Sequence, residues 1–126
     1  MNRVVLTLGS NIDKERNLPA AVALLRERAQ VTAVATVYET VPTGLLEQPN
    51  FLNTAVLLHT PLTPAQIKDD LIATIEKALH RVRQADKNAP RTIDLDLALY
   101  NDEVLDYVAS DGRSRHIPDP DILKFP

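Results

Sequence analysis

The sequence predicts an α+β fold in which helices pack on one face of a mainly antiparallel sheet. Two observations support this class. The chain has 126 residues, of which 44% are hydrophobic, a size and composition typical of one compact globular domain. Runs with strand and helix patterns also alternate along it in the order β-α-β-β-α-β, which favours two helices against a single sheet.

The first elements are a strand, a helix and a second strand. The β-rich run 4–8 ends at a Gly-Ser-Asn turn. In the helix that follows, Asn17 is the predicted N-cap and Pro19 lies in the first turn. Residues 31–39 are rich in Val and Thr, so we predict one continuous strand there.

A loop, a third strand and a second helix come next. The loop spans residues 40–50 and is long for so small a domain, which is typical of segments that carry function. Residues 51–59 are the predicted third strand. Thr63 and Gln66 form a capping box that starts the second helix. Its apolar face repeats every four residues, at Ile67, Leu71, Ile75 and Leu79.

The fourth predicted strand spans residues 92–100 and alternates apolar with polar side chains. Asp94 and Asp96 are expected on one face, with Cα atoms roughly 6.5–7 Å apart. The other face is expected to carry an apolar stripe of Ile93, Leu95, Leu97 and Leu99. A short fifth strand is expected around Val104, and we predict no further element after Ser110.

Composition excludes several classes of function. The formal charge of −3 does not favour nucleic-acid or membrane binding, and the absence of cysteine excludes disulfides and thiolate sites. With three glycines in total, the chain has neither a Walker loop nor a dinucleotide fingerprint, so side chains or metal ions would have to hold a phosphate. No apolar run is long enough to span a bilayer, and a cytoplasmic protein is the default expectation.

The strongest candidate for chemistry is a cationic loop that leads into the acidic strand. Asp94 and Asp96 can share a pair of Mg²⁺ ions, while Arg81, Arg83 and Arg91 can supply planar forks for phosphate. The plain alternatives are a solvated strand face for the aspartates and a helix C-terminus that complements its dipole for the arginines.

A second candidate lies on the third strand. Phe51 and Asn53 point to the same face, where an aromatic ring and an amide can recognise a flat heteroaromatic compound. Ordinary packing of the ring and a hydrogen bond at the strand end are the alternatives at this position.

Four ordered strings carry a resemblance to a known family: Leu8-Gly9-Ser10-Asn11, residues 38–44, residues 48–53 and Arg91-Thr92-Ile93-Asp94-Leu95-Asp96. Together, over residues 4 to about 107, they resemble the 6-hydroxymethyl-7,8-dihydropterin pyrophosphokinases of folate biosynthesis. The resemblance implies a ferredoxin-like βαββαβ fold, ATP and two Mg²⁺ ions, and pyrophosphoryl transfer to the pterin hydroxymethyl group with release of AMP.

The resemblance also implies roles for individual residues. Asp94 and Asp96 would hold the magnesium ions, and together with Arg81 and Arg91 they are the expected catalytic residues. The residues expected at the nucleotide are Glu76, Arg81, Arg83, Arg91 and Leu97. Those expected at the pterin are Thr40, Val41, Pro42, Thr43, Phe51 and Asn53.

The chain also departs from the family pattern. Ile117-Pro118-Asp119-Pro120 stands where the family usually has Pro-His, Asn88 replaces a common tryptophan, and Lys124 and Phe125 are out of register with the usual Arg and Phe. We therefore expect a single pyrophosphokinase-like domain over residues 1–126 that lacks the family's usual C-terminal segment and binds ATP more weakly. A non-catalytic pterin- or nucleotide-binding relative is the main alternative. An RNA-binding module fits poorly, because only 4% of the residues are aromatic and the central strand carries acids.

Overall fold

The computed structural model describes residues 1–42, 48–81, 90–101, 105–108 and 114–117. The elements in these ranges are β1 (Asn2–Ser10), α1 (Lys14–Arg28), β2 (Gln30–Val34), β3 (Tyr38–Thr40), β4 (Phe51–Thr60), α2 (Pro64–Gln66), the π-helical segment η1 (Ile67–Ile72), α3 (Ala73–Ala78), β5 (Asp94–Tyr100), β6 (Leu105–Val108) and β7 (Ser114–Ile117). None of the helices described is long and apolar enough to cross a membrane.

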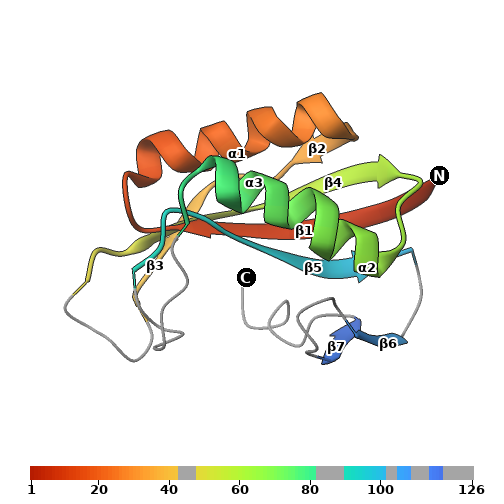
Figure 1. Cartoon of the computed structure of the whole chain (residues 1–126). Coiled ribbons are helices and arrows are strands. Elements are labelled where there is room, and N and C mark those ends of the chain that lie inside the picture. Colours follow the sequence, from red (N-terminus) through yellow and green to blue (C-terminus); the bar gives the residue numbers. More distant parts are fainter. Residues whose placement is uncertain (43–47, 82–89, 102–104, 109–113, 118–126) are drawn as a thin grey trace.

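The main sheet is antiparallel and has the strand order β2-β4-β1-β5. Strand β3 also pairs with β4, so β2 and β3 follow one another along the same edge. Figure 1 shows α1 and α3 side by side on one face of this sheet, and β6 and β7 form a separate two-stranded ribbon. The predicted α+β class and the placement of both helices on one face are confirmed.

The two faces of the main sheet differ in composition. Residues that pair across neighbouring strands share a face, and alternate residues along a strand lie on opposite faces. We call the side that α1 and α3 pack against the helix-covered face and the other side the opposite face. Apolar side chains from β1, β4, β5 and the helices fill the core on the helix-covered face; its largest fully buried members include Leu6, Leu25, Leu58, Ile67, Ile75 and Leu95.

The alternation predicted for β5 holds only as far as Leu97. Val5 on β1 pairs with Leu99 and Leu6 pairs with Leu97, so Ala98 is an extra residue that forms a bulge. The bulge returns Tyr100 to the helix-covered face, where its hydroxyl donates a hydrogen bond to the Leu62 carbonyl at 2.9 Å. The expectation that Leu99 joins the apolar stripe is therefore wrong.

Both helix starts can be compared with their predictions. The capping box is confirmed, because Gln66 N donates to Thr63 Oγ1 at 3.2 Å and Thr63 N donates to Gln66 Oε1 at 3.0 Å. The predicted start of α1 is wrong. The helix begins at Lys14, and Asn17 is a buried residue inside it whose side chain donates to the Ile12 carbonyl at 2.6 Å.

Two strand predictions also need correction. The single strand expected over residues 31–39 is two strands, β2 and β3, because regular pairing with β4 ends after Val34 and resumes at Tyr38. Between them the Ala35 N–H still donates to the Ala55 carbonyl. In the C-terminal region we predicted no element after Ser110, but β7 pairs there with β6.

Candidate active site

The opposite face carries a row of residues that runs across three adjacent strands, β4, β1 and β5. Gly9 on β1 pairs with Asn53 on β4 and with Asp94 on β5. Two residues further along these strands, Thr7 pairs with Asp96. Because paired residues share a face, Asp94, Asp96 and Asn53 lie on the same side of the sheet, away from the helices. Gly9 separates the two candidate groups and has no side chain to fill the space between them.

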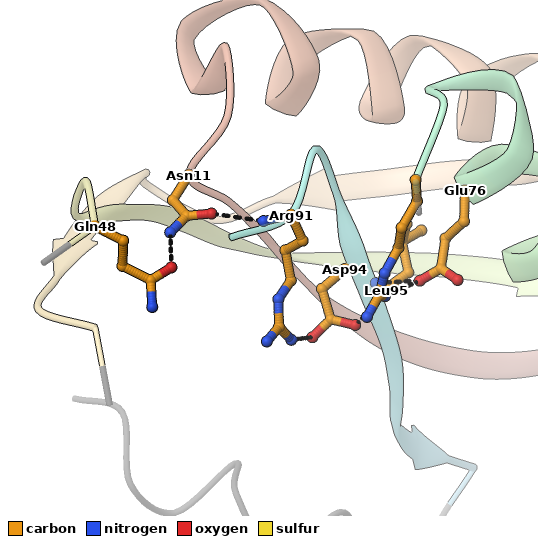
Figure 2. A network of polar contacts seen from close by, with 7 residues as sticks. Asn11, Gln48, Glu76, Arg91, Asp94 and Leu95 are labelled. Carbon is orange, nitrogen blue, oxygen red and sulfur yellow. Dashed lines mark hydrogen bonds and ion pairs between the residues drawn. The ribbon is translucent and has the colours of Figure 1, made fainter. Parts of the chain in front are cut away.

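Asp94 is held by two guanidinium groups. Figure 2 shows the contact with Arg91. Arg81 Nη1 lies 2.7 Å from Asp94 Oδ1, and Arg91 Nη1 lies 3.4 Å from Asp94 Oδ2. Burial alone would raise the pKa of Asp94, but the charges of Arg81 and Arg91 and hydrogen bonds with Arg81 and Asp96 lower it below its usual value. Asp94 is therefore a carboxylate at neutral pH and can act as a ligand for a cation.

Glu76 connects the second helix to this strand. Its side chain is 6% exposed, and Oε2 accepts hydrogen bonds from Arg81 Nη1 at 2.7 Å and from the Leu95 backbone N–H at 3.2 Å. Burial would lower the pKa of Arg81, but the charges of Asp94 and Glu76 raise it. Arg81 therefore stays charged between two carboxylates, and Glu76 fixes it against the start of β5.

The end of α3 determines where Arg81 lies. His80 has a positive φ of 60°. Its N–H donates to the Lys77 carbonyl at 3.1 Å, and the Arg81 N–H donates to the Glu76 carbonyl at 3.0 Å. These two bonds form a Schellman motif, with His80 at the position that glycine usually takes. The reversal turns the chain directly after the helix, so that Arg81 lies beside Glu76 and Asp94.

The candidate pterin residues meet this network through Arg91. The Arg91 guanidinium carbon lies 5.6 Å from the centroid of the Phe51 ring, a cation–π distance. Beside it, Asn53 Nδ2 donates to Thr40 Oγ1 at 2.8 Å and to the Tyr38 carbonyl at 3.4 Å. The structure thus brings Phe51, Asn53 and Thr40 together, next to one of the arginines that hold Asp94.

The remaining predicted site residues differ in their burial and in the face of the sheet on which they lie. Val41 is exposed and Pro42 is buried, directly after β3. Leu97 is buried in the core on the helix-covered face, so the structure does not bring its side chain together with the aspartates. Thr43, Arg83, Asn88, Asp119, Lys124 and Phe125 lie outside the described residues.

One residue of this region was missed by the sequence analysis. Asn11 is 2% exposed, and its side chain bonds to Gln48, Pro49 and the backbone N–H of Arg91. The sequence places Asn11 in a turn and in one of the four strings of the family resemblance, but neither assigns it a role. Its partners are 37 to 80 residues away along the chain, so no local pattern could identify them.

Within the described residues, no group of three or more His, Asp or Glu side chains is placed to hold a metal ion by itself. Mg²⁺ does not require one, because it is commonly bound by one or two carboxylates together with water and substrate phosphates. The donor set of Asp94 and Asp96 therefore fits magnesium that arrives with a polyphosphate.

Comparison with known proteins agrees with these observations. The family model for 7,8-dihydro-6-hydroxymethylpterin-pyrophosphokinase (HPPK) matches residues 5–126. The 2-amino-4-hydroxy-6-hydroxymethyldihydropteridine pyrophosphokinase of Bacillus subtilis is 45% identical over 107 residues, which are 82% of this chain and 63% of that protein. The protein of the same name from Aquifex aeolicus is 37% identical over 106 residues, 83% of this chain and 65% of that protein.

The protein of that name from Pseudomonas aeruginosa is also 37% identical, over 109 residues that make up 84% of this chain and 66% of its own length. The chain thus spans slightly less than two thirds of each of these relatives. The family match covers nearly every described element, including the strands that carry the polar row. This chain belongs to the 7,8-dihydro-6-hydroxymethylpterin-pyrophosphokinase family.

Proposed function

We propose that this chain transfers pyrophosphate from ATP to 6-hydroxymethyl-7,8-dihydropterin and releases AMP, a reaction of folate biosynthesis. Family membership and the names of the relatives support the activity. The observation that carries it is the row on the opposite face, in which Gly9 pairs with Asp94 on one side and with Asn53 on the other. A polyphosphate site and a heteroaromatic site are thereby adjacent on one surface.

In this proposal Asp94 and Asp96 hold two Mg²⁺ ions, and Arg81 and Arg91 contact the phosphates of ATP. Arg81 Nε supports this assignment: among the described residues it is a buried donor without a hydrogen-bond partner. Buried donors left unpaired in a native structure call for an explanation, and a phosphate oxygen would provide one. Glu76, which holds Arg81, and Arg83 complete the proposed nucleotide site. The side chain of Leu97 lies in the core on the helix-covered face and is not part of it.

The pterin side of the proposal rests on β3 and β4. Phe51 would stack on the ring, and Asn53 would bond to its edge through the amide that now meets Thr40. The backbone of residues 40–43 would complete this site. Because an amide both donates and accepts, Asn53 can form hydrogen bonds with a donor and an acceptor on the edge of a pterin.

The chemistry requires positioning and neutralisation of charge more than a covalent intermediate. The hydroxymethyl oxygen bonds to the β-phosphorus, and the bond between that phosphorus and the oxygen that bridges it to the α-phosphorus breaks. AMP leaves with the bridging oxygen, and the hydroxyl proton passes to solvent. Magnesium, when bound, neutralises the phosphate charge that develops. Arg81 and Arg91 orient the phosphates, and Phe51 and Asn53 orient the acceptor.

We also propose a ferredoxin-like fold from the order of the strands in the main sheet. If β1, β2, β4 and β5 are counted as the first to fourth strands, the sheet order is 2-3-1-4, all antiparallel, with helices after the first and third strands. That order supports a ferredoxin-like fold. The family match over residues 5–126 supports a single domain.

The direct test incubates the folded protein with MgATP and hydroxymethyldihydropterin and quantifies AMP by chromatography. We expect AMP and pterin pyrophosphate in equal amounts. The absence of AMP above background from folded protein would remove the enzymatic claim. Calorimetry would then examine the non-catalytic alternative, for which pterin binding is indifferent to MgATP.

A further inference from the structure

We propose that Asn11 is a positioning residue for the pyrophosphoryl transfer proposed above, on which this inference rests. It fixes the backbone of Arg91 to the segment 48–50 that leads into Phe51. Through this contact the phosphate side and the pterin side of the site keep one geometry. Asn11 does not touch the reacting atoms in this account, and it acts through Arg91 and Phe51.

The first set of contacts holds the backbone of Arg91 on both sides. Arg91 N donates to Asn11 Oδ1 at 2.8 Å. In the other direction the backbone N–H groups of Asn11 and Ile12 both donate to the Arg91 carbonyl, at 3.1 and 3.2 Å. Both backbone polar groups of Arg91 are therefore held by the turn that follows β1, immediately before the start of β5.

The second set of contacts reaches the loop before β4. Asn11 Nδ2 donates to Gln48 Oε1 at 2.6 Å and to the Pro49 carbonyl at 3.1 Å. The single amide thus uses both its oxygen and its nitrogen, each toward a different segment, while it is almost fully buried. Figure 2 shows Asn11 between Gln48 and Arg91, on the side of Arg91 away from Asp94 and Glu76.

These contacts close a loop of interactions around the site. From Pro49 the chain continues through Asn50 to Phe51. The guanidinium carbon of Arg91 lies 5.6 Å from the centroid of the Phe51 ring. The same guanidinium reaches Asp94 at 3.4 Å. A shift of about 1 Å at the Arg91 backbone would move its side chain against both partners, and misplacement on that scale can cost about 100-fold in rate.

The chain offers a matched control at the other end of the same two strands. Arg3 N donates to Asn101 Oδ1 at 2.8 Å, and Asn101 N donates to the Arg3 carbonyl at 2.7 Å. This pair repeats the contact between Asn11 and Arg91, again with an asparagine and an arginine backbone that link β1 with β5, but it lies far from the aspartates. Asn101 has a φ of 52°, so its replacement by alanine also introduces backbone strain.

The experiment compares Asn11→Ala with Asn101→Ala in steady-state kinetics and in urea unfolding. Both variants should lose stability. Only Asn11→Ala should lose turnover, by about 30- to 100-fold in kcat, whereas Asn101→Ala should stay within about twofold of the wild type per folded molecule. Equal kcat in the two variants would overturn the proposal, because Asn11 would then be a structural residue only.

A conservative variant separates the two halves of the contact. Asn11→Asp keeps an oxygen that accepts from the Arg91 N–H but loses the donor to Gln48 Oε1 and to the Pro49 carbonyl. We expect kcat within about fivefold of the wild type and a KM for the pterin that is raised about tenfold, because the segment that leads into Phe51 is no longer held. If Asn11→Asp loses as much kcat as Asn11→Ala, the link through Arg91 is wrong.

The two proposals can fail separately. A wild-type protein that releases no AMP refutes the proposed function, and Asn11 is then judged by hydrogen exchange at the Arg91 amide. Exchange should be faster in Asn11→Ala and near the wild-type rate in Asn11→Asp and Asn101→Ala. An unchanged rate in Asn11→Ala would refute the positioning role whether or not the protein is active.

Discussion

The two faces of the main sheet obey different rules, although the same strands build both. On the helix-covered face, neighbouring strands contribute Leu6, Leu58 and Leu95, which are fully or almost fully buried. On the opposite face, the row that crosses β4, β1 and β5 holds half-buried polar groups, including Asp94, Asp96 and Asn53. One face therefore supplies the free energy of folding through burial of apolar surface. The opposite face contributes less to this burial, and its strands can carry charged side chains that do not stabilise the sheet.

One charged residue does not follow this division between the two faces. Glu76 comes from the helix-covered side, yet its carboxylate reaches both Arg81 and the backbone of β5. It is a buried charge, and its bonds to Arg81 and to the Leu95 N–H hold an arginine of the opposite face against the start of β5. Glu76 thus connects the helices of the helix-covered face with the charged residues of the opposite face.

The largest expected effect comes from the aspartates. Asp94→Asn and Asp96→Asn should each lower kcat by about 1,000-fold or more, since each removes a charge that the proposed magnesium site requires. Circular dichroism should be unchanged. Asp70→Asn, at an exposed position of the second helix, is the matched control and should keep full activity. If either site variant remains as active as the control, the metal assignment is wrong.

Glu76 should give the largest change in stability. Glu76→Ala leaves the Leu95 N–H unpaired and removes one of the two carboxylates from Arg81, which should cost about 3 kcal/mol in the free energy of unfolding. Glu76→Gln keeps an acceptor for Leu95 and should cost about half as much. Urea denaturation measures both. A cost below about 1 kcal/mol for the alanine variant would mean that the carboxylate does not hold the helix to β5.

The ion pairs of Asp94 also predict a dependence on pH. Its pKa is lower in the folded than in the unfolded protein, where a value of about 3.9 is usual. The stabilisation is therefore complete above about pH 4 and is lost as the pH falls through the folded pKa. Wild-type protein should exceed Asp94→Asn in stability at neutral pH, and the gap should close on acidification. A gap that stays constant down to pH 2 would contradict the ion-pair account.

A smaller and more selective effect is expected at Gly9. A Cβ there would lie 3.0 Å from Asn53 Oδ1 and 3.8 Å from the Phe51 ring. Gly9→Ala should therefore raise the KM for the pterin by roughly tenfold through displacement of Asn53, with the KM for ATP nearly unchanged. Equal changes in both KM values would indicate a general distortion of β1 instead.

The smallest effect is expected at the end of α3. His80 adopts a left-handed conformation that costs a residue with a side chain about 1 kcal/mol, whereas glycine adopts it freely. His80→Gly should raise the free energy of unfolding by about 0.5 kcal/mol and leave kcat unchanged, because the Schellman bonds that place Arg81 are backbone bonds. A fall in kcat would show that the imidazole itself contributes to the site.

Local patterns predicted much of this fold. The capping box at Thr63 and Gln66 depends on residues three apart, and the structure contains both of its bonds. The shared face of Asp94 and Asp96 follows from strand alternation alone, and so does the shared face of Phe51 and Asn53 on the third predicted strand. These features need no knowledge of distant partners.

Features that depend on pairing between distant segments could not be predicted. The bulge at Ala98 arises from the register between β1 and β5, so alternation misplaced Leu99. The role of Asn11 depends on distant partners too, since only the folded chain brings Gln48 and Arg91 to it. The start of α1 was misplaced for a local reason: asparagine is common at helix N-caps, but the Asn17 side chain bonds to the Ile12 carbonyl from inside the helix.

The central claim is that the opposite face of the sheet, at Asp94 and Asp96, is where nucleotide and magnesium bind. A crystal structure with Mg²⁺ and a nonhydrolysable ATP analogue tests it most directly. We expect density for metal between these two carboxylates and the phosphate oxygens, with Arg81 and Arg91 turned toward the phosphates. A nucleotide bound elsewhere, or on this face with neither aspartate near a metal ion, would contradict the account.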